Sequence, residues 1–250
     1  MKAVMLAAGV GSRLYGDDGT QPPKALMRFD GKTLLCRHVE ILKRHGIESL
    51  TLVVGYRKEE LLAELQAMDA GDYVTPVFNP DFRDGPVVSF WLARDALTTG
   101  NGALFMDADV LYHPSLIGRL IAAPSPNCFL FDRHLDPGVD PVRLCIKGGV
   151  PVDIGKMVEG EFDLVGEWPG FLKFSPGIAR RVTDVAERLI REGRRSLAYE
   201  PAMREVLLSE PKGTFSFEDI SDVPWIEIDF PEDLERAKSE ILTRIRAMGT

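Results

Sequence analysis

The sequence predicts an α/β protein with a mostly parallel sheet flanked by helices. In the first 110 residues, short apolar runs alternate with segments of helical periodicity, and the first run ends in a glycine turn. Strands and helices that alternate at such intervals form βαβ units around a parallel sheet. The 250 residues, 45% hydrophobic and 27% charged, are enough for one large domain with a substantial core.

The elements of the first half follow from apolar runs and turn signals. Four continuous apolar runs predict buried strands over residues 3–8, 49–55, 74–78 and 102–106. Helical spacing of leucines and valines predicts helices over residues 33–46, 57–68 and 89–97, the first capped by Thr33. Residues 25–29 are expected to form a brief extended piece before the turn at Asp30 and Gly31.

The second half has a less regular pattern. Strands are predicted over residues 127–131 and 225–229, and a hairpin over 142–154 around Lys147 to Gly149. Helices are predicted over residues 179–191, 202–208 and 231–248, the first started by Ser175 or Pro176 and the last capped near Asp229 or Pro231. No linker separates two domains, so we expect a single domain.

Charge and cysteine content exclude several classes of protein. A net charge of −8 and a pI near 5.1 argue against a nucleic-acid-binding surface, although a few local cations suffice for small anions. The three cysteines show no CxxC spacing and are expected to be free thiols: Cys36, Cys128 and Cys145. The chain starts in a strand and has no membrane-length apolar run, so we expect a cytoplasmic protein. The oligomeric state is open, a homodimer included.

The glycine turn after the first strand predicts an anion-binding site. Gly9 to Arg13 reads GVGSR, and Lys24 follows two prolines. Glycines leave backbone N–H groups open to an anion, and Arg13 and Lys24 add two positive charges. The dinucleotide fingerprint is incomplete, because its sixth position is Leu14 and the second predicted strand ends without an acidic residue. The phosphate-loop pattern GxxxxGK[ST] is absent as well.

These residues carry a resemblance to a known family. Residues 6–14 (LAAGVGSRL) followed by residues 23–26 (PKAL) resemble the signature of nucleotidyltransferases that make activated sugars and alcohols. Residues 54–56, 77–79, 107–109 and 227–229 resemble the phosphocholine cytidylyltransferase-like branch. The resemblance covers nearly the whole chain and is dense in residues 1–110. Residues 86–89 (PVVS) depart from it, since that branch often has asparagines before the serine.

The resemblance implies a fold and a reaction. The fold is a Rossmann-like nucleotidyltransferase domain over residues 1–250, with a nucleotide-binding half (1–110), an acceptor-binding insertion (111–224) and a closing strand and helix (225–250). In the reaction, a phosphate or phosphonate oxygen of a small acceptor attacks the α-phosphorus of CTP and releases pyrophosphate. Lys24 is expected to neutralise the α-phosphate, and Arg13 to hold the β- and γ-phosphates with the backbone of Gly11 and Ser12.

Three carboxylates are candidate ligands for Mg²⁺, which prefers oxygen donors. Asp109 comes just after a predicted strand, where parallel sheets bind their ligands. Glu227 and Asp229 alternate with isoleucines, so both side chains are expected on one face of the final strand. By resemblance, Asp109 and one of the other two bind the metal, and Glu227 is favoured.

The substrate-binding residues follow from the same resemblance. Nucleotide contacts are expected from Leu6, Ala7, Ala8, Gly9, Gly11, Ser12, Asn79, Ser89 and Asp107. Asn79 and Asp107 are also open to interpretation as turn or cap residues. Acceptor contacts are expected from Arg133, Lys156, Glu167, Trp168, Tyr199 and Glu200. Trp168 and Tyr199 are hypothesised to form a face for an amine, with core packing as the alternative.

Two other functions remain open at this level. A sugar-1-phosphate nucleotidyltransferase would use UTP or dTTP in place of CTP. A non-catalytic nucleotide-binding regulator would share the fold. The joint presence of Arg13, Lys24, Asp109 and Glu227 speaks against the regulator, because a binder needs no metal carboxylates.

Overall fold

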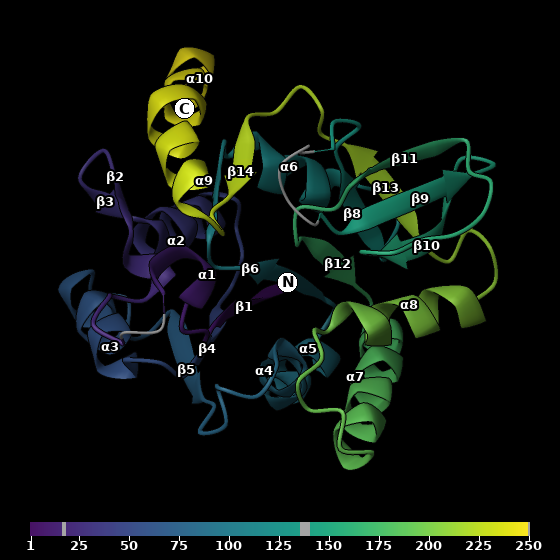
Figure 1. Cartoon of the computed structure of the whole chain (residues 1–250), viewed down its shortest axis with the longest axis horizontal. Coiled ribbons are helices and arrows are strands. Elements are labelled where there is room, and N and C mark those ends of the chain that lie inside the picture. The colour runs from purple at the N-terminus through teal and green to yellow at the C-terminus, as the bar shows by residue number, and fades with distance from the viewer. Residues whose placement is uncertain (17–18, 136–140, 250) are drawn as a thin grey trace.

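A seven-stranded mixed sheet forms the centre of the molecule in a computed structural model that describes residues 1–16, 19–135 and 141–249 (Figure 1). Its strand order is β13-β8-β12-β6-β1-β4-β5. The strands are β1 (Lys2–Ala7), β4 (Leu50–Val54), β5 (Val74–Phe78), β6 (Ala103–Asp107), β8 (Cys128–Phe131), β12 (Leu172–Phe174) and β13 (Ser216–Asp219). Neighbouring strands run parallel except at β12, which is antiparallel to both β6 and β8.

Helices cover both faces of the sheet and bury the alternating side chains of its strands. Ala3 and Met5 of β1 pack into a core beneath α2 (Leu34–Arg44), α3 (Lys58–Ala67) and α6 (Ser115–Ala122). Val4 points to the opposite core, formed with α4 (Pro86–Leu92), α5 (Arg94–Thr98), α7 (Pro176–Arg191) and α8 (Glu200–Ser209). In Figure 1, α2 lies above the central strands, and α4, α5 and α7 lie below them. The predicted α/β fold with a mostly parallel sheet is confirmed.

Smaller elements surround the carboxyl ends of the central strands. They are β2 (Arg28–Phe29) paired with β3 (Lys32–Thr33), β7 (Val110–Tyr112) paired with β14 (Trp225–Glu227), and a sheet of β10 (Val150–Gly155), β9 (Arg143–Lys147) and β11 (Leu164–Glu167). A short helix, α1 (Ser12–Tyr15), follows the glycine turn, and a 3₁₀ turn, η1 (Lys24–Leu26), contains Lys24. The C-terminal helix comprises α9 (Pro231–Arg236), a π-helical turn η2 (Ala237–Ile241) and α10 (Leu242–Met248), and it packs on a third core.

Several predicted boundaries agree with the structure. The strand over residues 74–78 has the predicted bounds. Thr33 caps α2 by accepting a hydrogen bond from the backbone N–H of Cys36 at 3.0 Å, and Ser175 caps α7 by accepting one from Ile178. The predicted hairpin is formed by β9 and β10. These signals are local, because each depends on residues within a few positions along the chain.

Other boundaries differ for identifiable reasons. The helix predicted from residue 89 begins at Pro86, since proline suits the first helical turn, and it is divided into α4 and α5 at Ala93. The final strand ends at Glu227, because the Asp233 side chain turns the chain by accepting hydrogen bonds from the N–H groups of Asp229 and Phe230. The piece over residues 25–29 starts as 3₁₀ helix. Strands β7, β11, β12 and β13 were not predicted as separate strands.

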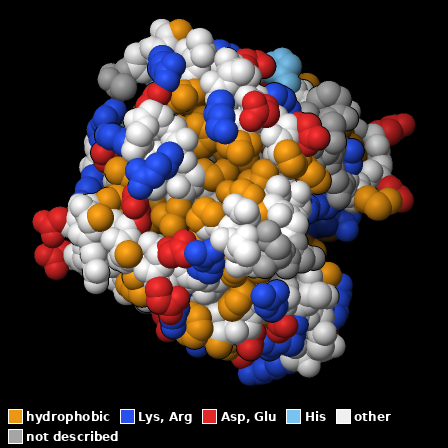
Figure 2. All heavy atoms as spheres, turned by 60° about the vertical axis from the view of Figure 1, so that its left-hand side comes forward, with side chains coloured by type: hydrophobic (Ala, Val, Ile, Leu, Met, Phe, Trp, Pro, Cys, Tyr) orange, Lys and Arg blue, Asp and Glu red, His pale blue; other side chains and the backbone are white. Residues whose placement is uncertain are grey.

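The three cysteines are free thiols, as predicted, and those of Cys128 and Cys145 are buried. Within the described residues, no helix has the length and apolar character needed to cross a membrane. One face of the molecule carries a band of hydrophobic side chains with charged side chains around it (Figure 2). The segment 111–224 supplies β8, β12 and β13 to the main sheet and also forms the separate β10-β9-β11 sheet.

Candidate functional site

Two clefts meet beyond the carboxyl ends of β1 and β6, the edge at which parallel sheets bind their ligands. The first cleft, of about 510 Å³, is lined chiefly by residues 6–13, 24–25, 82–86, 107–109 and 198–200. The second, of about 470 Å³, is lined chiefly by one side of the C-terminal helix and by Asp132, His134, Leu135, Pro141, Val142, Trp225, Ile226, Glu227 and Asp229. Four side chains line both clefts: Arg13, Lys156, Glu200 and Glu227.

The glycine turn shapes one end of the first cleft. Gly11 has a φ of +74°, a conformation that favours glycine, and it precedes the first turn of α1. A Cβ atom at this position would lie 3.2 Å from Cγ of Lys24. The missing side chain therefore allows the loop and Lys24 to approach each other closely, as the sequence motif suggested.

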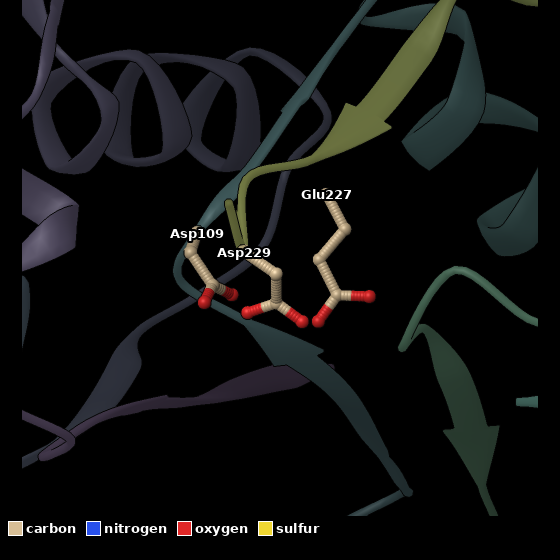
Figure 3. Close-up of side chains that lie close together, drawn as sticks. All are labelled: Asp109, Glu227 and Asp229. Atoms are coloured by element: carbon tan, nitrogen blue, oxygen red, sulfur yellow. The ribbon is translucent and has the colours of Figure 1, made fainter. Parts of the chain in front are cut away.

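Three carboxylates converge where the clefts meet (Figure 3). One oxygen each of Asp109, Glu227 and Asp229 lies within 4.8 Å of the others. Antiparallel pairing of β14 with β7 produces this arrangement, because it places Glu227 opposite Val110 and joins the N–H of Ile228 to the carbonyl of Asp109 at 3.0 Å. Carboxylate oxygens alone form the group, and this donor set fits a hard divalent cation such as Mg²⁺.

Two positively charged side chains, those of Lys24 and Arg13, bind these carboxylates directly. Nζ of Lys24 lies 2.9 Å from Oδ2 of Asp109 and 2.6 Å from Oδ1 of Asp229. Nη1 of Arg13 lies 2.9 Å from the other oxygen of Asp229. Burial by itself would lower the pKa of Lys24, but the charges of Asp109 and Asp229 outweigh it and raise that pKa above its ordinary value. Lys24 therefore stays charged in the folded protein.

Asp107 is not part of this carboxylate group and is held by a different partner. Its Oδ2 accepts a hydrogen bond from the hydroxyl of Tyr199, and a Cβ atom at Gly170 would lie only 2.5 Å from the same oxygen. Burial, followed by the charge of Asp109, raises the pKa of Asp107 well above its ordinary value. Burial and the charges of Asp109 and Asp229 likewise raise the pKa of Glu227. The carboxyl groups of the site therefore outnumber the two positively charged side chains, Lys24 and Arg13, that could neutralise them.

Most of the predicted nucleotide-binding residues do line the first cleft. They are Leu6, Ala7, Ala8, Gly9, Gly11, Ser12, Ser89 and Asp107, together with Arg13 and Lys24. Asn79 does not line it. Its side chain is buried, with Nδ2 donating to Oγ of Ser89 at 2.9 Å and Oδ1 accepting from the N–H of Asp81 at 2.9 Å. Asn79 is thus a turn residue that positions Ser89, which was the alternative interpretation.

The predicted acceptor-binding residues divide into two groups. Lys156, Glu167 and Glu200 line the second cleft. Trp168 and Tyr199 are buried instead, packed edge to face with ring centroids 6.1 Å apart, and Trp168 donates from Nε1 to the carbonyl of Phe171 at 2.8 Å. Only the first cleft contacts Tyr199. These two rings therefore do not form the predicted face for an amine.

Arg133 also differs from its predicted role. Its Nε forms an ion pair with Oδ2 of Asp219 at 2.5 Å, on the exposed side of β13, and it lines neither cleft. The sequence alone does not distinguish this surface pair from an acceptor contact, because Asp219 lies 86 residues further along the chain.

Other cleft residues were missed from the sequence. Asp132 is buried in the second cleft and accepts a hydrogen bond from Nε1 of Trp225 at 2.8 Å. One face of the C-terminal helix adds Asp233, Arg236, Glu240, Ile241 and Arg244. The sequence signal for these residues was their spacing of three to four positions, which places them on one side of a helix. What the spacing does not reveal is that this side faces the site.

A family model and individual proteins match the chain. Residues 3–150 match the MobA-like NTP transferase domain. A CMP-5'-(3-aminopropyl)phosphonate synthase of Streptomyces rubellomurinus is 31% identical over 247 residues, which cover 95% of this chain and 38% of that enzyme. The chain therefore spans less than half the length of this relative.

Two further matches span whole proteins. A CTP:phosphoglutamine cytidylyltransferase of Campylobacter jejuni is 25% identical over 254 residues, covering 94% of this chain and 98% of that one. The solved inositol-1-phosphate CTP transferase from T. maritima superposes with a TM-score of 0.75 at 21% identity, covering 98% of this chain and 96% of that one. The structural match shows that the fold is shared.

Proposed function

The chain belongs to the MobA-like NTP transferase family, and on that premise we propose that it is a Mg²⁺-dependent cytidylyltransferase. It transfers CMP from CTP to a small phosphorylated or phosphonate acceptor and releases pyrophosphate. The observation that carries this proposal is the convergence of Asp109, Glu227 and Asp229 with Lys24 and Arg13 at the junction of two clefts. A nucleotide and an acceptor bound in the two clefts would meet at this junction.

The charges at the junction suit the reaction. A phosphate or phosphonate oxygen must approach the α-phosphate of the nucleotide, and these two anions repel each other. Positive charge held in position lowers the barrier to such a transfer. Lys24 would neutralise the α-phosphate and Arg13 the departing pyrophosphate, with the N–H groups of Gly11 and Ser12 oriented towards the triphosphate. Asp109, Glu227 and Asp229 would hold Mg²⁺. The metal would add positive charge to that of Lys24 and Arg13.

No general base is needed for this chemistry, because the attacking oxygen is already ionised near neutral pH. The residues around the junction therefore need to position and neutralise rather than accept a proton. This agrees with the first cleft, where Asp107 accepts a hydrogen bond from Tyr199 and is not part of the carboxylate group. Asp107 would help to shape the nucleotide pocket instead of binding the metal.

The identity of the nucleotide is proposed from the relatives. The names of the three proteins above specify CTP or a CMP product, and their acceptors are an aminopropylphosphonate, phosphoglutamine and inositol 1-phosphate. They share a small acceptor with a phosphate or phosphonate group. The base would be read by the backbone of Leu6 to Ala8 and by the hydroxyl of Ser89, which line the first cleft.

Pyrophosphate release tests the proposal. The purified protein is incubated with CTP, UTP, dTTP or GTP, with and without Mg²⁺, against a panel of phosphorylated amines, polyols, phosphonates and hexose 1-phosphates. We expect release that requires CTP, Mg²⁺ and a non-sugar acceptor. Release with UTP or dTTP and a hexose 1-phosphate, but none with CTP, would identify a sugar nucleotidyltransferase. Tight CTP binding without release for any acceptor would identify a regulator.

The cytoplasmic location and the homodimer stay predictions. Analytical ultracentrifugation of the purified chain determines the oligomeric state directly. Fractionation of the source cells determines the location. Neither outcome alters the proposed reaction, because every side chain named at the junction comes from one chain.

A further inference from the structure

Glu200 carries a buried oxygen that lacks a hydrogen-bond donor. It is the first residue of α8, and its side chain lines both clefts. Its Oε2 atom is buried and accepts no hydrogen bond from residues 1–16, 19–135 or 141–249. Buried polar atoms of folded proteins are nearly always hydrogen-bonded, so an exception inside a cleft points to a ligand. The ligand group that meets Oε2 must be a hydrogen-bond donor.

The surroundings of Glu200 favour a donor with positive charge. Burial raises the pKa of the Glu200 carboxyl above its ordinary value, whereas the charges of Lys156 and Arg13 act in the opposite direction. A neutral donor would satisfy the oxygen, but the negative charge would be compensated only in part, because burial outweighs the effect of Lys156 and Arg13. An ammonium group would supply both the hydrogen bond and the charge.

The second cleft, which Glu200 lines, contains further buried carboxylates. Asp132 and Glu167 are buried there, on adjacent backbone joined by hydrogen bonds of 2.7 and 2.9 Å. Arginines of the C-terminal helix face the same cleft in ion pairs within their own helix, Arg236 with Asp233 and Arg244 with Glu240. The carboxylates that line the second cleft outnumber its lysines and arginines, so the cleft as a whole is suited to a cationic group.

Resting on the proposed function, we propose that Glu200 selects the acceptor, with Oε2 accepting a hydrogen bond from the primary ammonium group of a small phosphorylated or phosphono alkylamine. The anionic end of that acceptor faces Lys156, which lines the same junction. A hydroxyl group can donate a hydrogen bond but brings no positive charge, and a quaternary ammonium brings the charge but has no N–H to donate. The acceptor class is therefore primary amines, in preference to polyols and choline-like cations.

Three acceptors on one two-carbon backbone test the selection in the intact protein. They are phosphoethanolamine, ethylene glycol monophosphate and phosphocholine, each assayed with CTP. We expect kcat/KM for phosphoethanolamine to exceed the other two by about tenfold to a hundredfold, the effect of one charge-assisted hydrogen bond. Equal kcat/KM for all three would overturn the inference and leave the proposed function intact. Failure of CTP to react with these three acceptors and with every acceptor of the wider panel would instead refute the proposed function.

A substitution assigns the selection to Glu200. In Glu200→Gln we expect KM for phosphoethanolamine to rise by about tenfold to a hundredfold, with ethylene glycol monophosphate changed by less than about threefold. Glu205→Gln is the matched control on the same helix, where an exposed Glu205 pairs with Arg188. An equal loss for both acceptors, with a raised KM for CTP, would place Glu200 against the nucleotide and overturn the inference.

A second variant covers the case in which Glu200→Gln does not fold. Glu200→Asp keeps the carboxylate but withdraws it by one methylene group. We expect Glu200→Asp to bind phosphoethanolamine more weakly than the native protein and still to prefer it to ethylene glycol monophosphate. Loss of that preference in a variant that melts like the native protein would count against the inference.

Discussion

Lys24 and Asp229 lie 205 positions apart in the sequence, yet Nζ of the lysine is 2.6 Å from Oδ1 of the aspartate. The same ammonium group lies 2.9 Å from Oδ2 of Asp109. It therefore connects the glycine-loop segment to two carboxylates of the candidate metal site. A divalent cation that binds these carboxylates must share them with Lys24 or displace it.

Lys24→Met should separate metal affinity from catalysis. Without the ammonium group, the carboxylates of Asp109 and Asp229 lack a counter-charge, so we expect the nucleotide-free protein to bind Mn²⁺ about tenfold more tightly. The rate of CMP transfer should fall by about 10²- to 10³-fold, because a positive charge near the α-phosphate is lost. Electron paramagnetic resonance of free Mn²⁺ measures the affinity.

Lys58→Met is the control for this change, since Lys58 lies over the ring of Phe78, away from both clefts. In the native protein, CTP should tighten Mn²⁺ binding, because the triphosphate competes for Lys24 and Arg13 and frees the carboxylates. Unchanged Mn²⁺ affinity in folded Lys24→Met would show that the lysine and the metal do not compete.

Asp233 should act as a positioning residue for Asp229. Its buried Oδ2 accepts hydrogen bonds from the N–H groups of Asp229 at 3.0 Å and Phe230 at 2.8 Å. In Asp233→Ala both N–H groups lose their acceptor, and we expect the free energy of unfolding to fall by about 2–3 kcal/mol. Mn²⁺ affinity should fall as well, because the turn that orients Asp229 loosens. Urea denaturation and Mn²⁺ titration are the measurements.

Asp233→Asn is the matched comparison, because an amide oxygen still accepts from the same N–H groups. It should retain most of the metal affinity that Asp233→Ala loses. Oδ1 of Asp233 also lies 3.8 Å from Nη1 of Arg236. Equal losses of metal affinity in the two variants would mean that the negative charge of Asp233, and not its hydrogen bonds to the turn, supports metal binding.

Tyr199→Phe should destabilise the protein because it removes the hydroxyl that donates to the partly buried Asp107. We expect a loss of about 1–3 kcal/mol in the free energy of unfolding, the cost of leaving this carboxyl without its partner. Tyr73→Phe is a matched control, because the buried hydroxyl of Tyr73 has no hydrogen-bond partner among the described residues. Its stability should change little or increase. Similar losses in both variants, measured in urea, would exclude the hydrogen bond as the cause.

His38 should make stability depend on pH. Burial lowers its pKa from 6.5 to about 4, and its ring nitrogens lie 3.1 Å from the hydroxyl of Tyr112 and the carbonyl of Ala108. Between pH 6.5 and 4 the unfolded chain binds a proton that the folded chain does not, so stability falls as pH falls through that window. From pH 7 to 5 the loss should be about 2 kcal/mol.

His38→Gln removes this titration and keeps an amide donor for Ala108. The native protein should therefore lose about 2 kcal/mol more than His38→Gln when urea denaturation is compared at pH 7 and pH 5. Parallel pH profiles for the two proteins would contradict the assignment to His38.

The positions of site residues were predicted best from the sequence where they depend on the backbone geometry of neighbouring residues. Gly11 and the residues after β1 were placed correctly in the first cleft, because a strand followed by a glycine turn has one common geometry. Asp109 was placed correctly relative to its strand for the same reason, since the carboxyl ends of parallel strands share one edge of the sheet.

The sequence predicted least where a side chain depends on distant packing. Trp168 and Tyr199 were assigned to the acceptor, but aromatic rings serve equally in a core, and neighbours from α4, β6 and β8 bury them. Arg244 and Asp132 were missed for a related reason. Only the folded chain brings the C-terminal helix and the end of β8 to the same cleft.

The pairing of β14 with β7 has a consequence for synthesis of the chain. Lys24 is synthesised 205 residues before Asp229, so the two sides of the junction emerge from the ribosome at different times. A nascent chain on the ribosome can form most of the central sheet before residue 225 is added, but it lacks two of the three carboxylates at the junction. Activity should therefore begin only when the final strand has emerged, because the same segment completes both the carboxylate group and the third core.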